Sequence, residues 1–448
     1  MKKILFLFAC LLIFAGCKKS SFEAKFDEDP EIRMGEAIAK VKNTLSGAEN
    51  GWIATTPTAD GGGYSFFMKF DGTENVKMYA DLNDASAKTE YASYYRVKQD
   101  QGVDLVFDTF TYITMLNDPD PSTFGGIVKT GFKSDVDFIY DRSSGDSIVF
   151  IGKRYRQPLK MVKATAAQRT AYESAGLKTA IDKIKAFFTA NANPYIEVVS
   201  GGATLRVGVA PNLTNSVLSG KRMDLVGVLA DGNTVFSSGQ KFAFTLTGTE
   251  LLNGGLIWQG ITFVKMEWKD ATTLALYDST GKEYIIKNAP APIVPLYRLW
   301  GSKYGGMLSE YKTIYPGTSA NGATILNYYH NGLVPPTQPY SFNYGRINFV
   351  WNVANNRLTI NGFSSQNGGS SGWTTTIVYA YTTDANGVYK FTQFSAASGG
   401  YVATPLSRLH TFMLNNRVTF DYFVSGANVY GKMTSVEDPS IVMTFVLQ

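Results

Sequence analysis

Residue types that carry chemistry are scarce in this chain of 448 residues. Histidine occurs twice, at His330 and His410, and cysteine occurs twice, at Cys10 and Cys17. Protein zinc sites are built mainly from His and Cys at close spacing, and no such spacing occurs here. We interpret the residues around His330 as a turn and His410 as structural. We therefore expect no metal, no cofactor and no catalysis that depends on histidine.

Carboxylates leave one catalytic alternative open. Hydrolysis by paired acids needs only two carboxyl groups that face each other at about 5–9 Å. Six aspartates lie close together in the sequence and could also supply oxygens to calcium: Asp118, Asp120, Asp135, Asp137, Asp141 and Asp146. The spacing of an EF-hand is absent, and an Asp-Pro turn with a solvated strand face explains the same residues. A carboxylate-pair hydrolase is accordingly the third hypothesis.

Aromatic side chains support a binding hypothesis. Extracellular glycan binders stack sugar rings on Trp and Tyr and bind the hydroxyl groups with amides and carboxylates. The C-terminal part of the chain offers Tyr328, Tyr329, Trp351 and Trp373 next to turns rich in Asn, Gly and Ser. The stretch Asn361–Gly372 has no apolar anchor, so we expect a mobile, exposed loop there. Trp373 follows that loop directly and is the residue that we most expect to be exposed.

The N-terminus predicts where these residues operate. Lys2 and Lys3 precede an apolar run of 12 residues, Ile4–Ala15. A bilayer-spanning helix needs about 20 residues, whereas this length is typical of a signal peptide. Phe14-Ala15-Gly16-Cys17 resembles the lipobox of bacterial lipoproteins, which implies a signal peptide of residues 1–16 and acylation of Cys17. Residues 17–30 are then a lipid-anchored tether.

The composition excludes other classes. Without Lys2 and Lys3, 40 basic residues remain against 37 acidic ones, which is too small an excess to indicate nucleic acid as a partner. With Cys10 removed and Cys17 acylated, the body has no thiol for a disulfide. Charged residues make up 18% of the chain and aromatic residues 14%. Many Tyr, Thr, Gly and Phe with few charges favour strands and turns over helices.

The pattern along the chain predicts a mainly β protein with a few helices, of the α+β class. A helix near residues 30–50 is followed by antiparallel β meanders, with turn signals such as Asp71-Gly72. A second helical stretch near 165–190 begins with Thr165 and Gln168 at capping-box spacing, and Gly176 is expected to break it. Further strands follow it. Residues 31–290 thus form one or two β-rich domains.

Two further features concern domain organisation. The order helix then meander occurs twice, about 130 residues apart, which suggests an internal duplication. Three prolines fall between Asn288 and Pro295, and we expect a Pro-rich linker at 291–297. Beyond it, residues 298–448 are predicted to form a C-terminal all-β domain, a sandwich or a barrel.

Three features together resemble an uncharacterised family of Bacteroidota lipoproteins. They are the lipobox, the early helix ending at Gly51-Trp52, and Phe107–Tyr112 leading to Asn117–Pro121 and 131–138. The resemblance covers about residues 1–290. Members are often encoded beside the transporter and the surface binding lipoprotein of starch-utilisation-type uptake systems, and some loci hold a zinc metallopeptidase lipoprotein. The resemblance implies a setting in nutrient capture and no catalytic residue.

The leading hypothesis is a non-enzymatic lipoprotein of the outer membrane, on its surface or its periplasmic face, that is accessory to uptake of a polymeric nutrient. Its C-terminal domain would bind a glycan or a peptide, and its partners would include an outer-membrane transporter and the surface binding lipoprotein. The alternative is a structural or adhesive surface protein that contacts other proteins.

Overall fold

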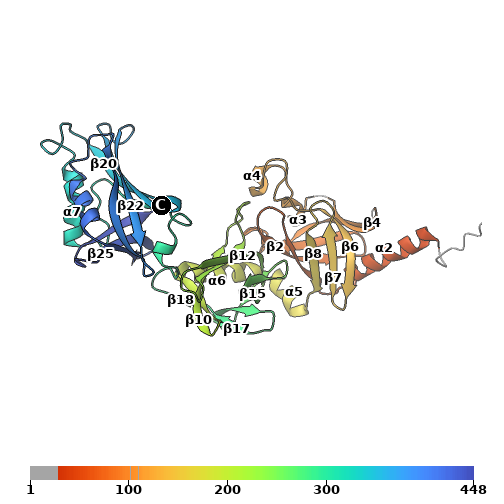
Figure 1. Cartoon of the computed structure of the whole chain (residues 1–448). Helices are drawn as coiled ribbons and strands as arrows, with labels where there is room; N and C mark the ends of the chain where they lie inside the picture. The colour runs from red at the N-terminus through yellow and green to blue at the C-terminus, as the bar shows by residue number, and fades with distance from the viewer. Residues whose placement is uncertain (1–28, 101, 109) are drawn as a thin grey trace, which may run out of the picture.

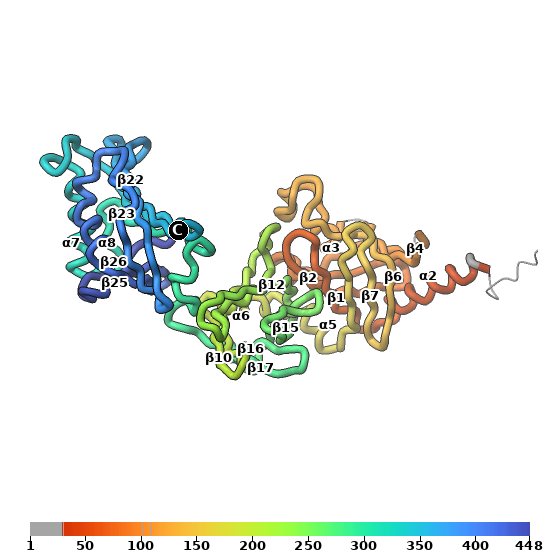
Figure 2. The backbone as a smooth tube through the Cα atoms, viewed as in Figure 1, coloured from red at the N-terminus to blue at the C-terminus, as the bar shows by residue number. Residues whose placement is uncertain are grey.

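The computed structural model describes residues 29–448 except 101 and 109. The predicted signal peptide, Cys17 and the tether up to residue 28 lie outside the described residues. The described chain forms three units in a row: a closed barrel, a curved sheet and a second closed barrel (Figures 1 and 2). The α+β class with antiparallel sheets is thus confirmed. No helix in the described part of the chain has the length and apolar character needed to cross a bilayer.

The first barrel is an eight-stranded antiparallel meander that closes by pairing its last strand with its first. Its strands are β1 (Trp52–Pro57), β2 (Gly63–Phe70), β3 (Asn75–Ala80), β4 (Tyr91–Gln99), β5 (Val103–Phe107), β6 (Asp137–Ser144), β7 (Ser147–Gly152) and β8 (Pro158–Lys163). Alternate residues point inward, so Tyr64, Phe66 and Met68 fill the barrel while Phe67 faces the next unit. This alternation follows from the geometry of a β-strand, in which successive side chains point to opposite faces of the sheet.

Helix α2 (Pro30–Ser46) packs against the first barrel. Val41 and Leu45 enter the barrel core, and the Trp52 indole N–H donates to the Leu45 carbonyl at 2.9 Å. Proline begins the helix, where its missing N–H costs no hydrogen bond. Two short helices, α3 (Tyr112–Met115) and α4 (Pro121–Phe124), lie in the connection from β5 to β6.

The middle unit wraps a curved sheet around helix α6 (Gly176–Ala190), whose Leu177, Ile181 and Ile184 are buried. The sheet order is β17-β16-β15-β13-β12-β11-β10-β9-β18, with β14 paired to β15. The bounds are β9 (Pro194–Ser200), β10 (Ala203–Asn212), β11 (Arg222–Val228), β12 (Val235–Phe244), β13 (Gly248–Leu251), β14 (Leu256–Trp258), β15 (Ile261–Trp268), β16 (Leu274–Asp278), β17 (Glu283–Ile285) and β18 (Lys287–Asn288).

The predicted capping box is confirmed at the start of α5 (Ala166–Glu173). The Thr165 side chain accepts from the Gln168 N–H, and the Gln168 side chain accepts from the Thr165 N–H. The helical stretch does break before Gly176, but the left-handed residue is Ala175, with φ of 60°. The core under the middle sheet is distinct from the one inside the first barrel, although Phe67 and Tyr79 of the first barrel contribute to it. The internal duplication stays a prediction.

The C-terminal unit is again an eight-stranded barrel, closed between β19 and β26. Its elements are β19 (Gly306–Ser309), α7 (Ala320–Asn331), β20 (Tyr344–Asn352), β21 (Arg357–Ser365), β22 (Trp373–Thr383), β23 (Val388–Ser398), α8 (Ser407–Asn415), β24 (Val418–Ser425), β25 (Asn428–Ser435) and β26 (Val442–Leu447). The prediction that this domain is all β is wrong, because α7 and α8 are present. Helix α7 contains Asn, Gly and Thr, which are weak helix formers, so its sequence does not predict a helix.

The predicted Pro-rich linker at 291–297 packs against the C-terminal barrel. Val294 and Leu296 are buried in the barrel core, and the Tyr422 hydroxyl donates to the Val294 carbonyl at 3.1 Å. On the other side, Arg298 donates to the Gly232 carbonyl at 3.1 Å. These contacts seat this end of the barrel on the middle sheet.

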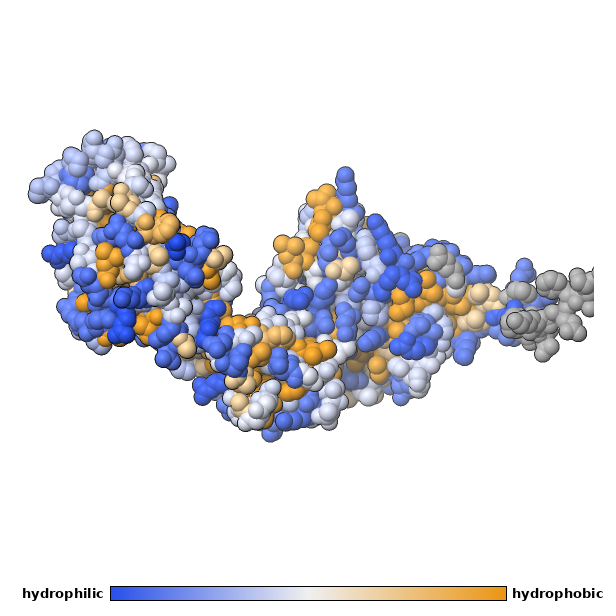
Figure 3. All heavy atoms as spheres, viewed as in Figure 1, coloured by the Kyte–Doolittle hydropathy of each residue, from blue (hydrophilic) through white to orange (hydrophobic). Residues whose placement is uncertain are grey.

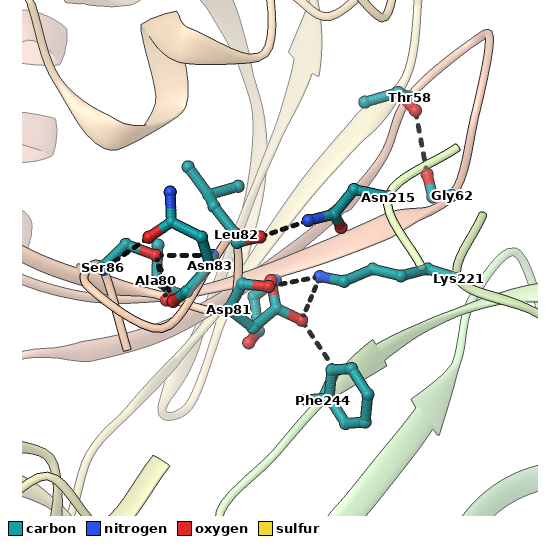
Figure 4. Close-up of polar contacts among 11 residues, drawn as sticks. Thr58, Gly62, Ala80, Asp81, Leu82, Asn83, Ser86, Asn215, Lys221 and Phe244 are labelled. Carbon is teal, nitrogen blue, oxygen red and sulfur yellow. Dashed lines mark hydrogen bonds and ion pairs between the residues drawn. The ribbon is translucent and has the colours of Figure 1, made fainter. Parts of the chain in front are cut away.

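A buried ion pair joins the first barrel to the middle sheet (Figure 4). The Lys221 ammonium lies 2.7 Å from the Asp81 carboxylate and donates to the Asp81 carbonyl at 2.7 Å. The same carboxylate accepts from the Ser65 N–H of β2 at 2.9 Å and from the Phe244 N–H of β12 at 2.8 Å. Both side chains are at most 2% exposed. Asp81 therefore connects three segments from two units.

Close backbone packing around this pair requires glycine. A Cβ on Gly63 would lie 2.3 Å from Leu252 Cδ1, and one on Gly62 would lie 2.5 Å from the Gly220 carbonyl oxygen. The hairpin between β1 and β2 thus sits directly against the middle sheet.

Removing one member of the pair should be more harmful than removing both. We expect Lys221→Met to lower the free energy of unfolding by about 3–5 kcal/mol, because Asp81 would stay buried without its counter-charge. The double variant Lys221→Met with Asp81→Asn should recover part of that loss. Chemical denaturation measures both, and Lys269→Met, which removes the exposed ion pair with Glu283, is the control and should change little. Equal losses in the single and double variants would contradict this account.

Candidate ligand-binding surface

The four aromatic residues predicted to bind a ligand do not lie together. Trp373 is 43% exposed, as expected, whereas Tyr329 and Trp351 are buried in the core of the C-terminal barrel. Tyr328 is partly buried on α7, and the Arg408 guanidinium covers its ring at 4.4 Å. Only Trp373 presents a free face of its ring to solvent.

The prediction for Trp351 is wrong because its strand turns the side chain inward. In β20, Ile347, Phe349 and Trp351 share the face that fills the barrel. The Trp351 ring stacks on Trp300 at 4.9 Å with an interplanar angle of 16°. The alternation of Ile347 and Phe349 with Trp351 was visible in the sequence and would have indicated this burial.

Tyr329 is likewise structural. It lies in α7, and its hydroxyl donates to the Phe363 carbonyl at 2.6 Å and to the Arg346 carbonyl at 3.1 Å. Burial raises the pKa of Tyr329 far above its usual value. The residue therefore fastens the helix to two barrel strands and has no surface for a ligand.

Both histidines lie in helices. The interpretation of His330 as a turn residue is wrong: it occupies the last turn of α7, is 2% exposed, and has Nε2 at 3.4 Å from the Ser309 hydroxyl. His410 of α8 has Nδ1 at 2.7 Å from the Tyr379 hydroxyl. Burial lowers the pKa of His330 to about 4 and also lowers the pKa of His410. Neutral imidazoles of this kind pack and accept hydrogen bonds.

The burial of His330 should make the stability of the C-terminal barrel sensitive to acid. Between about pH 6.5 and pH 4 an unfolded imidazole is protonated, while the folded one stays neutral, so unfolding takes up a proton. Stability should therefore fall as the pH drops through this window, by at most about 1.4 kcal/mol per pH unit. His330→Gln should show a shallower slope than the native protein in denaturation at pH 7, 6, 5 and 4. Identical slopes would show that His330 does not titrate in this way.

Two aspartates of residues 118–146 have structural roles. The buried Asp135 carboxylate accepts from the Arg154 N–H at 2.7 Å and from the Tyr155 N–H at 3.0 Å. Burial raises its pKa, and these two hydrogen bonds oppose the rise. Asp120 caps α4 by accepting from the Ser122 N–H at 2.9 Å. Across the described part of the chain, no three His, Cys, Asp or Glu side chains gather as they would around a metal ion.

Trp373 belongs to an exposed aromatic cluster that the sequence did not reveal. Tyr340, Trp373 and Tyr401 are 44%, 43% and 42% exposed. The Tyr401 ring centroid lies 4.8 Å from that of Tyr340 and 5.8 Å from that of Trp373. Phe342, only 3% exposed, supports the Trp373 ring from within at 5.9 Å. We call Tyr340, Trp373 and Tyr401 the aromatic patch.

Barrel topology brings the patch together. Tyr340 lies just before the start of β20, Trp373 at the start of β22 and Tyr401 just after the end of β23. Because neighbouring strands are antiparallel, these positions meet at one end of the barrel. The linker contacts lie at the opposite end, where the Tyr389 hydroxyl donates to the Tyr297 carbonyl at 3.4 Å. The patch therefore occupies the free end of the molecule.

The loop beside the patch is tied down. The predicted mobile loop at 361–372 is wrong in its first half, because 361–365 belong to β21 and Ser364 and Ser365 are buried. In the remainder, the Asn367 side-chain oxygen accepts from the Ser371 N–H at 3.1 Å, and the Asn343 side-chain oxygen accepts from the Gly368 N–H at 3.0 Å. These short side chains hold the loop in place by hydrogen bonds to its backbone N–H groups.

A shallow hollow of about 570 Å³ adjoins Tyr401. Pro335, Pro336, Pro339 and Thr404 contribute to its lining. Gln338 orders this segment, since its amide donates to the Leu333 carbonyl at 2.5 Å and accepts from the Tyr340 N–H at 2.5 Å. The hollow and the patch form one continuous surface through Tyr401.

A second hollow, of about 680 Å³, lies between the first barrel and the middle sheet. Lys160 of β8 lines one side, and Glu250 and Lys265 of the sheet line the other. Burial raises the pKa of Glu250, while the charge of Lys160 and a hydrogen bond to Thr55 lower it. Charges of both signs thus meet in this cleft.

Comparisons with known proteins give one family match, to the first two units. No curated protein matches the chain. Among solved structures, pol III beta from Caulobacter crescentus is similar at 10% identity over 92% of this chain and 98% of that chain, with a TM-score of 0.11. A TM-score this low carries no argument. The profile of the family described as a domain of unknown function (DUF4302) matches residues 23–270, that is, the first barrel and most of the middle sheet. The chain therefore belongs to the DUF4302 family.

Proposed function

We propose that this protein is a lipid-anchored, non-enzymatic accessory of nutrient uptake at the outer membrane, and that its aromatic patch binds a polymeric ligand, a glycan or a peptide. One observation carries the proposal. Three large rings, each more than 40% exposed, gather at the free end of the C-terminal barrel, where the Tyr401 ring contacts both Tyr340 and Trp373. Exposed rings gathered in one place are typical of binding surfaces, where aromatic anchors supply most of the affinity.

The membrane part of the proposal rests on the sequence. The lipobox at residues 14–17 supports an acylated Cys17, and acyl chains on one residue hold a protein on a membrane. The resemblance to Bacteroidota lipoproteins beside starch-utilisation-type systems supports a transporter and its surface binding lipoprotein as partners. Helix α2 begins at the opposite end of the molecule from the patch (Figure 2). An anchor before α2 would hold the patch away from the membrane.

The anchor is tested by replacing one residue. Cys17→Ala should move the protein from the membrane fraction to the soluble fraction of cells and abolish incorporation of labelled fatty acid. Cys10→Ala is the control and should change neither, because this residue leaves with the signal peptide. Fatty-acid labelling that persists in Cys17→Ala would show that Cys17 is not the acylated residue.

The patch is tested by affinity electrophoresis with a panel of soluble polysaccharides and peptides. Trp373→Ala should weaken the binding of the retarding polymer at least tenfold, a loss of about 1.4 kcal/mol. Tyr94→Ala removes a ring that is 59% exposed on the first barrel and should leave the affinity unchanged. If the native protein binds none of the polymers and self-associates instead, the alternative of a structural or adhesive surface protein replaces this proposal.

A further inference from the structure

The stretches that carry the aromatic patch contain no charged residue. They are residues 331–345, 358–383 and 391–407, and none contains Asp, Glu, Lys or Arg. Charged residues make up 18% of the whole chain, so their absence is particular to these three stretches. In Figure 3, which is coloured by hydropathy, the upper end of the C-terminal barrel is mostly pale, and deep blue gathers lower on the same unit.

Three charged side chains near these stretches have partners outside the patch. Glu310 accepts a hydrogen bond from the Tyr344 hydroxyl at 3.4 Å, the Arg346 guanidinium lies over Phe363 at 5.2 Å, and the Arg408 guanidinium lies over Tyr328 at 4.4 Å. Among the described residues, no ion pair or cation–π contact involves Tyr340, Trp373 or Tyr401. A charged polymer would therefore lose hydration at the patch without meeting a counter-charge, which is unfavourable.

The polar groups around the patch are amides and hydroxyls. Exposed members of this set are Ser341, Asn343, Gln366, Asn367, Ser370, Ser371, Thr374 and Thr404. Amides and hydroxyls both donate and accept hydrogen bonds, as the hydroxyl groups of an uncharged sugar do. The chemistry of this end favours an uncharged glycan.

The angles between the rings restrict the shape of the ligand. The Tyr401 ring is inclined by 66° to Tyr340 and by 74° to Trp373, and the centroids are only 4.8 Å and 5.8 Å apart. Rings set at such angles cannot all lie flat on one planar ribbon. They offer faces in different directions around Tyr401, which suits a chain that bends.

We propose, resting on the function proposed above, that the aromatic patch takes an uncharged, soluble polysaccharide whose chain curves around Tyr401. Polyanions and flat, extended chains are excluded by the missing counter-charges and by the ring angles. The hollow beside Tyr401 receives the continuation of the chain.

Isothermal titration calorimetry of the full-length protein tests this with hexasaccharides of matched length. Maltohexaose and laminarihexaose are uncharged and curved, cellohexaose is uncharged and extended, and hexagalacturonate is charged. A Pro-rich decapeptide represents the peptides that bind aromatic grooves. At least one curved glucan should bind at least tenfold more tightly than cellohexaose, and hexagalacturonate should give no signal. Raising NaCl from about 0.05 M to about 0.5 M should change the affinity less than twofold, because no charge takes part.

Two variants locate the binding. Tyr401→Ala should weaken the curved glucan at least tenfold, and Tyr94→Ala should leave it unchanged. If hexagalacturonate, cellohexaose or the peptide binds best and Trp373→Ala abolishes that binding, the proposed function stands and this inference is overturned. If none of the five probes binds, both the proposed function and this inference fail.

Discussion

The Asp81–Lys221 pair is the contact on which the arrangement of the first two units depends. Burial lowers the pKa of Lys221 to about 8, while the neighbouring carboxylate favours the charged form. The Lys221 ammonium also lies 4.2 Å from the centre of the Tyr64 ring. A buried pair of this kind contributes little over apolar packing, but it strongly disfavours any arrangement that separates its members. It therefore fixes how the barrel docks on the sheet, and the family profile spans both units.

The C-terminal barrel is attached differently. At its linker end, Arg298 donates to the Gly232 carbonyl and to the Asn233 side chain, and Val226, Val228 and Val235 of the middle sheet pack against the core of the barrel. Its other end makes no contact with the first two units (Figure 1). The two barrels share a strand count and a meander order.

Local sequence signals predicted local structure well. Proline at the start of α2, the capping box of α5 and the turn signal at Asp71-Gly72 act within a few residues, so the chain reveals them directly. Barrel closure has no such local signal, because Thr55 pairs with Lys160 across more than a hundred residues. Helix α7 was missed for a related reason. Its residues are weak helix formers, and the burial of Leu326 and Tyr329 in the barrel core supports it.

The candidate site shows the same difference between residues with a local sequence signal and residues without one. Trp373 could be predicted to be exposed because it follows a stretch of Gly, Ser and Asn. Its partners Tyr340 and Tyr401 carry no local signal, since only the antiparallel order of β20 to β23 brings the three loops together. The missing charges, in contrast, could be read from the sequence once the three loops were known to be neighbours.

The strand order also has a consequence for how the chain acquires its structure during synthesis. Each unit completes its sheet with a strand from its own segment: β8 pairs with β1, β18 with β9 and β26 with β19. Most other pairings join successive strands, and such local contacts favour fast folding. Each unit can thus fold as its own segment is made, from the N-terminus onward. Asp81 must wait for its counter-charge, because Lys221 lies 140 residues further along the chain.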